Sequence, residues 1–87
     1  MKISTGYILK KVAGKNIVVS VGDNSGFNGM ITLNDTGAFF WNLLEKDTTT
    51  DEMLKKVMAE YDVSSDEASK DIDNFINKLR KEGILED

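Results

Sequence analysis

Apolar and polar residues alternate through the first part of the chain, and this alternation predicts strands. Two β-type runs cover Tyr7–Val12 and residues 16–21, and Gly14 between them can adopt the positive φ of a tight turn. A polar loop over residues 22–28 then leads to a third apolar run at residues 29–33. The pattern therefore predicts a hairpin followed by a third strand.

The second run indicates which side chains share a face of the predicted sheet. Ile17, Val19 and Val21 point to one side, whereas Val18 and Ser20 point to the other. This is the period expected when one face of a strand is buried.

The pattern becomes helical at Asn34, a residue suited to the N-cap, with Asp35 favourably placed in the first turn. We expect this helix to end near Glu45. Its apolar residues cover more than one face and should be largely buried as core, rather than form a ligand platform: Ala38, Phe39, Phe40, Trp41, Leu43 and Leu44. Three consecutive aromatic residues cannot all face one way, so one of them should be partly exposed.

Two capping boxes predict two further helices. Thr49 with Glu52, and Ser64 with Glu67, can each satisfy backbone donors at a helix start. Gly83 is placed to end the last helix in the left-handed conformation. That helix carries one apolar stripe: Ala68, Ile72, Phe75, Ile76 and Leu79.

The predicted order, β-β-β-α-α-α, indicates an α+β, winged-helix-like fold with a three-stranded antiparallel sheet followed by a three-helix bundle. A chain of 87 residues, 40% of them hydrophobic, has room for one core, so we expect a single domain over residues 1–87. The sequence holds no Cys and no His, which removes imidazole bases, thiolate nucleophiles and iron–sulfur ligands. We therefore expect no catalytic residue, no cofactor and no metal.

The net charge of -4 argues against a nucleic-acid partner. A winged-helix DNA-binding regulator is the main alternative function, but the first half of the last helix would repel phosphates because Lys70 stands alone among carboxylates: Asp66, Glu67, Asp71 and Asp73. The chain shows neither a signal peptide nor a run of ~20 apolar residues, so we expect a cytoplasmic protein with no membrane contact.

Two motif-like segments favour structural interpretations. The loop that begins at Asp23 offers oxygen ligands, but Asn28 and Asn34 occupy the positions where a calcium-binding EF-hand needs Gly and Glu. We interpret it as a turn between strands. The glycosylation sequon at residues 34–36 is better explained as a helix cap.

The third strand, Gly29 to Leu33, supplies another kind of site. A three-stranded sheet has two edges with unpaired backbone groups, and an extended peptide can add to such an edge as a fourth strand. The alternative is an edge that is short or covered by the last helix, and the residues leave both readings open. An open edge also permits strand exchange between copies, and so a homodimer.

Residues 27–41 resemble the central signature of PqqD-like proteins, in which an apolar strand runs through a Leu-Asn-acidic-Thr-Gly turn into an aromatic helix. The segment from Phe75 to Leu85 also resembles the family's last helix and tail, and the similarity extends from Tyr7 to Leu85. Members of this family recognise the leader of ribosomally made, post-translationally modified peptides. The resemblance implies that a leader adds beside the third strand, in a groove next to the last helix.

On this chain the resemblance implies peptide-binding residues on one strand and one helix. The strand residues are Gly29, Met30, Ile31, Thr32 and Leu33; the helix residues are Asp71, Phe75 and Lys78. The opposite flank of the helix, through Ser69, Asp73 and Arg80, stays open as an alternative.

The resemblance also implies a separate modifying enzyme as partner, often a radical SAM maturase. The product, pyrroloquinoline quinone (PQQ) or another modified peptide, stays open.

A third class of function is a small assembly subunit that binds a folded protein through the surface of residues 39–41.

Overall fold

The computed structural model describes residues 1–21 and 31–86, so the predicted loop at residues 22–28 and the predicted strand residues Gly29 and Met30 lie outside the described residues. The elements follow in the order β1 (Lys2–Ile3), β2 (Tyr7–Val12), β3 (Lys15–Ser20), β4 (Ile31–Leu33), α1 (Asp35–Leu44), α2 (Thr50–Glu60), α3 (Ser65–Lys81) and β5 (Leu85–Glu86).

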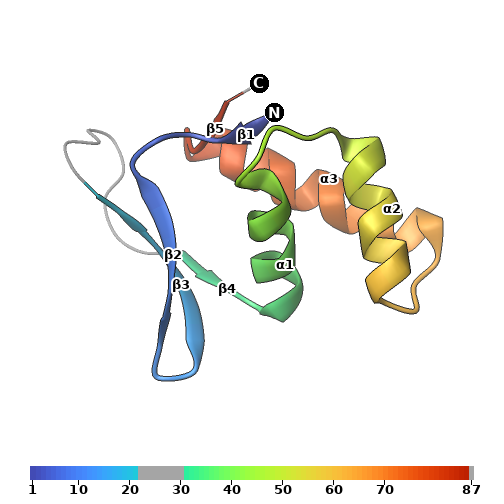
Figure 1. The fold of residues 1–87 in the computed structure, drawn as a ribbon, viewed down its shortest axis with the longest axis horizontal. Coiled ribbons are helices and arrows are strands. Elements are labelled where there is room, and N and C mark those ends of the chain that lie inside the picture. The colour runs from blue at the N-terminus through green and yellow to red at the C-terminus, as the bar shows by residue number, and fades with distance from the viewer. Residues whose placement is uncertain (22–30, 87) are drawn as a thin grey trace.

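Strands β2, β3 and β4 form an antiparallel sheet in that order, and the three helices lie together to one side of it (Figure 1). The predicted α+β class, the three-stranded antiparallel sheet and the three helices are thus confirmed. The winged-helix-like label stays a prediction. No helix in the described part of the chain is long and apolar enough to cross a membrane.

The hairpin between β2 and β3 closes through a two-residue turn. Val12 pairs with Lys15, and Ala13 and Gly14 between them have φ values of 52° and 80°. Two consecutive positive φ angles match the twist of the flanking strands. Gly14 was expected to adopt such a φ; Ala13 gives no sequence signal, because residues with a Cβ rarely enter this region.

The buried face of β3 is the one that carries fewer apolar residues in the sequence. Leu9, Val18 and Ile31 are aligned across the three strands, and Val18 is 0% exposed. Val21, on the face with Ile17, is 43% exposed. The alternation is confirmed. The face with Ile17, Val19 and Val21 lies away from the helices, because the pairing register of β3 with β2 and β4 determines which face meets the core.

Helix α1 begins at the predicted cap. The side-chain oxygen Oδ1 of Asn34 accepts a hydrogen bond from the Gly37 N–H at 2.8 Å. Trp41 is 1% exposed, and the half-buried Phe39 ring meets the Tyr61 ring edge-on at a centroid distance of 5.4 Å. The prediction that these aromatics are mostly core, with one partly exposed, is confirmed.

Helices α2 and α3 begin at the predicted caps as well. The hydroxyls of Thr49 and Ser64 accept hydrogen bonds from the N–H groups of Glu52 and Glu67, each at 3.2 Å. The Glu52 carboxylate accepts a further bond from the Thr48 hydroxyl at 2.9 Å. The whole predicted stripe of α3 is buried: Ala68, Ile72, Phe75, Ile76 and Leu79.

A second, two-stranded sheet joins β1 and β5, and sequence analysis did not predict it. Gly83 has the expected positive φ, 72°, and the Ile84 N–H then donates to the Leu79 carbonyl at 2.9 Å. This turn directs β5 back along β1, which Figure 1 shows beside it.

The N-terminal ammonium of Met1 lies on the α1–α2 connection. It donates to the Asp47 carboxylate at 2.8 Å and to the Thr48 carbonyl at 3.0 Å. The hydrogen bond and the positive charge of this ammonium lower the pKa of Asp47 below its ordinary value.

Candidate functional site

An open groove of about 360 Å³ lies between β4, the start of α1 and one side of α3. Its first wall is formed by Thr32, Leu33, Asn34, Thr36, Gly37 and Phe40. Its second wall, from α3, is formed by Asp71, Asn74, Phe75 and Lys78.

The base of the groove is aromatic. Phe40 of α1 and Phe75 of α3 are 3% and 9% exposed, and their rings pack at a centroid distance of 5.4 Å and an angle of 65°. Such a tilted pair adds to the stabilisation from buried apolar area. The groove therefore has a rigid apolar floor that joins two helices.

Gly37 allows these elements to approach one another. A Cβ at this position would lie 3.2 Å from the Leu33 Cβ, 3.2 Å from the capping oxygen of Asn34 and 3.5 Å from the Cε1 of Phe75. Leu33 is held by its pairing with Asn16, and the Asn34 oxygen by its bond to the Gly37 N–H, so neither can easily move. The glycine serves close packing here rather than an unusual φ.

The rim of the α3 wall is polar. Asp71, Asn74 and Lys78 are exposed and follow one another at helical spacings of three and four residues, which places them on one side of the helix. Thr32 and Thr36 line the groove from the wall formed by β4 and the start of α1. An apolar floor with hydrogen-bonding groups and both signs of charge on its rim can hold a side chain and bind polar groups around it.

The structure brings together most of the residues predicted for the site. Thr32, Leu33, Asp71, Phe75 and Lys78 all line the groove. Ile31 belongs to the same strand, but its side chain packs against the core. The alternative flank of α3 does not contribute to the described lining: Ser69, Asp73 and Arg80.

Sequence analysis did not assign five residues of this lining to the site: Asn34, Thr36, Gly37, Phe40 and Asn74. Asn74 has a usable signal, because it is three residues after Asp71 and four before Lys78. Gly37 and Phe40 had been assigned to a turn and to the core, and only the packing of α1 against α3 brings them to the groove.

The two edges of the sheet differ in charge. Strand β2 is one edge and carries exposed Lys10 and Lys11 in its second half. Strand β4 is the other edge, and its residues, Ile31 to Leu33, carry no charge. Lysines on an edge strand oppose the addition of another strand. The edge without them is the one beside the groove.

The alternative sites are less well supported. Phe40 and Trp41 are buried, so residues 39–41 do not form an exposed surface for a folded partner. The first turn of α3 carries Asp66 and Glu67, the charge expected to repel DNA. Within residues 1–21 and 31–86, no cluster of three or more His, Cys, Asp or Glu side chains could hold a metal ion.

Two solved structures share this fold. One is described as TbiB1 in complex with the TbiA(beta) leader peptide: its TM-score is 0.80 and its identity 23%, over 99% of this chain and 95% of that chain. The other is lasso peptide synthetase B1 complexed with the leader peptide, with a TM-score of 0.75 and 19% identity over 95% of this chain and 93% of that chain. A comparison with curated proteins gave no match.

Family membership follows from a match along the chain. Residues 6–85 match the family described as coenzyme PQQ synthesis protein D (PqqD). The match includes the strand–turn–helix segment on which the resemblance was based, and both walls of the groove fall within it. The chain therefore belongs to the PqqD family.

Proposed function

We propose that the chain is a non-catalytic binding protein that captures the leader of a ribosomally made precursor peptide and presents it to a separate modifying enzyme. The leader adds to the free edge of β4 as a fourth strand and places side chains in the groove between β4 and α3. The proposed peptide-binding residues are Gly29, Met30, Ile31, Thr32, Leu33, Asp71, Phe75 and Lys78.

The observation that carries this proposal is the position of the groove directly beside the uncharged sheet edge. An added strand gains affinity from backbone hydrogen bonds to β4, whatever its sequence. Alternate side chains of that strand point toward the same face, where the Phe40–Phe75 floor and the polar rim supply selectivity. The opposite edge, β2, also borders a pocket, at Tyr7, Ile8 and Leu9, but its exposed Lys10 and Lys11 oppose an added strand.

The comparisons support a peptide partner. Both similar structures are complexes with leader peptides, and they share the fold over nearly the whole chain. The partner enzyme in this proposal is a radical SAM maturase, which supplies the chemistry that a chain without His or Cys lacks. The proposed place of action is the cytoplasm, where precursor peptides are made.

The test is an NMR titration of the labelled protein with the leader of a short precursor peptide encoded beside its gene. Shift changes should concentrate on residues 31–33 and along α3 from Asp71 to Leu79. A lack of binding by such leaders would contradict the proposal. Shift changes confined to elements outside the groove would point instead to a different binding surface.

Strand addition can be tested separately by changing the peptide backbone alone. Successive leader residues are N-methylated, which removes one donor at a time while the protein stays unaltered. Because a strand directs its N–H groups to opposite sides in turn, binding should weaken roughly tenfold at every second position and change little at the positions between. A uniform loss along the peptide would exclude an added strand.

A further inference from the structure

Helix α3 is electrically polarised along the groove. Its first turn carries Asp66 and Glu67, and its last turn carries Lys78, Arg80 and Lys81. Of the charged residues of α3, two belong to the described groove lining: Asp71, toward the acidic end of the helix, and Lys78, at its basic end. A bound segment therefore meets a negative charge at one end of the groove and a positive charge at the other.

The spacing of these two charges suits an extended chain. Asp71 and Lys78 are seven positions apart on the helix, which corresponds to about 10.5 Å along the axis at the usual rise. Side chains on one face of a strand recur at about 7 Å for i and i+2 and about 13.5 Å for i and i+4. The flexible four-carbon stem of Lys78 can accommodate the remaining difference of ~3 Å.

We take the two charged side chains of the bound segment to be at positions i and i+4, because this spacing also places one side chain of the segment over the aromatic floor between Asp71 and Lys78. Phe75 lies between Asp71 and Lys78 on the helix, and its ring packs on Phe40 at the base of the groove. A side chain at i+2 would lie above this aromatic pair, where an apolar group is favoured. If the charged side chains of the bound segment were at i and i+2, no side chain on its groove-facing side would lie between them to cover the aromatic floor.

The direction of the segment follows from the arrangement of β4 and α3. In Figure 1, β4 runs toward the start of α1 while α3 runs the opposite way, from the light orange end to the red end. Both existing pairings of the sheet are antiparallel, and antiparallel pairing is slightly more stable per residue. A segment antiparallel to β4 runs with α3 and passes Asp71 before Lys78.

We infer that the groove selects an extended segment with the order basic–x–apolar–x–acidic from its N-terminal to its C-terminal end. The basic side chain pairs with Asp71, the apolar side chain covers Phe75, and the acidic side chain pairs with Lys78. This inference rests on the proposed function and names the class of leader that the site accepts.

The experiment uses three capped synthetic peptides that differ only in charge, with cores Lys-Thr-Leu-Thr-Glu, Lys-Thr-Leu-Thr-Lys and Glu-Thr-Leu-Thr-Glu between Ser-Thr and Thr-Ser ends. Affinities are measured by NMR titration at low salt. The unaltered protein should prefer the Lys/Glu peptide by about three- to tenfold. Asp71→Lys should shift the preference to the Glu/Glu peptide, and Lys78→Glu to the Lys/Lys peptide.

Matched controls lie on the same helix outside the described groove lining. Asp73→Lys and Arg80→Glu change the net charge by the same amounts as the two groove variants. They should leave the preference for the Lys/Glu peptide unchanged. A nitroxide at the N-terminus of that peptide should broaden signals near Asp71 more than those near Lys78.

Each outcome decides the inference. Equal binding of the three peptides, or control variants that change the preference as the groove variants do, would overturn the charge pairing. Broadening at the Lys78 end would overturn the direction. Either failure, with the natural leader still bound, would leave the proposed function intact; loss of binding by the natural leader and all three peptides would overturn both.

Discussion

The choice of buried sheet face can be tested by one substitution made at two neighbouring positions. Val18→Thr replaces a methyl group by a hydroxyl at a residue that is 0% exposed and aligned with Leu9 and Ile31. Burying a hydroxyl without a partner costs about 1–3 kcal/mol. Val19→Thr makes the same chemical change on the outer face, where Thr suits a strand and the effect should stay within about 0.5 kcal/mol.

The assay is thermal and urea unfolding followed by circular dichroism. For a domain of this size, each 1 kcal/mol shifts the melting temperature by about 4–8 °C. A loss of about 2 kcal/mol at Val18 therefore predicts a melting temperature about 8–16 °C lower, with the slope of the urea transition unchanged. Equal effects of the two variants, or a larger effect of Val19→Thr, would refute the assignment of the helix-facing side.

Three further predictions concern the cap, the ammonium–carboxylate pair and the protected edge. Asn34→Ala should cost about 1 kcal/mol, because the Gly37 N–H loses its acceptor; an unchanged melting temperature would show that the cap is dispensable. The pKa of Asp47 is lowered in the folded protein, so the stability that its ionised carboxylate contributes is present at a pH above the unfolded-state pKa and is lost as the pH falls through the folded-state pKa. A carboxyl NMR titration with a midpoint at or above 3.8 would contradict this. Replacing Lys10 and Lys11 together by Thr should produce concentration-dependent association in sedimentation velocity, whereas the same change at residues 55 and 56 of α2 should leave a monomer–oligomer distribution like that of the unaltered protein.

Local chemistry made much of the fold predictable. The three caps, Asn34, Thr49 and Ser64, each depend on a side chain and an N–H three residues later, so the sequence alone identifies them. The end of α3 at Gly83 is local in the same sense. The observed helices consequently begin where the caps predicted.

Features that depend on distant partners were not predictable. Ile17, Val19 and Val21 outnumber Val18 on the other face, so the alternation in β3 favours the face that lies away from the helices. β1 and β5 are each two residues long, too short to show a period, and they pair across almost the whole chain.

The groove shows the same division between local and distant information. Its α3 rim could be anticipated from helical spacing and from the family resemblance. The contribution of Gly37 could not, because a helical glycine reads as a weak position until the approach of Leu33 and Phe75 is known. Phe40 likewise reads as core from its sequence neighbours, and it is both core and floor.

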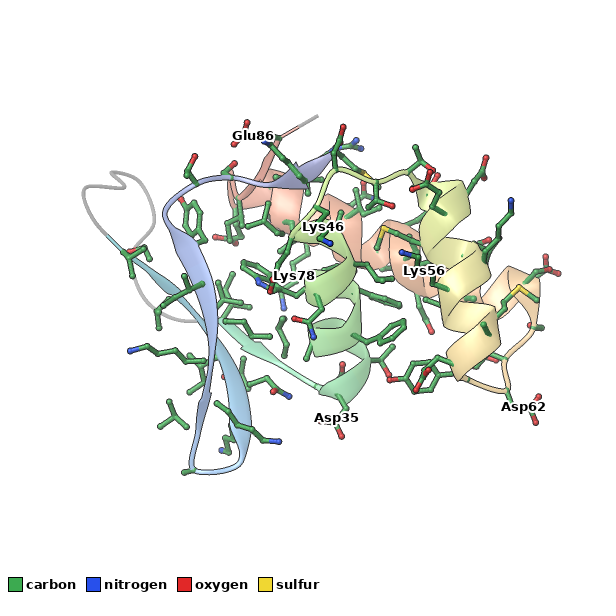
Figure 2. The ribbon with its side chains drawn as sticks, viewed as in Figure 1. Asp35, Lys46, Lys56, Asp62, Lys78 and Glu86 are labelled. Atoms are coloured by element: carbon green, nitrogen blue, oxygen red, sulfur yellow. The ribbon has the colours of Figure 1, made fainter. Side chains whose placement is uncertain are left out.

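The pairing of β1 with β5 brings the two ends of the described chain to the same side of the molecule (Figure 1), and charged side chains such as Glu86 lie near that side (Figure 2). Neither strand contributes to the groove lining. A linker to a catalytic domain could therefore enter and leave at neighbouring points without stretching across the peptide site. A linker joined to Met1 would also replace the ammonium that pairs with Asp47, so a fusion at this end would alter the α1–α2 connection and leave the groove uncovered.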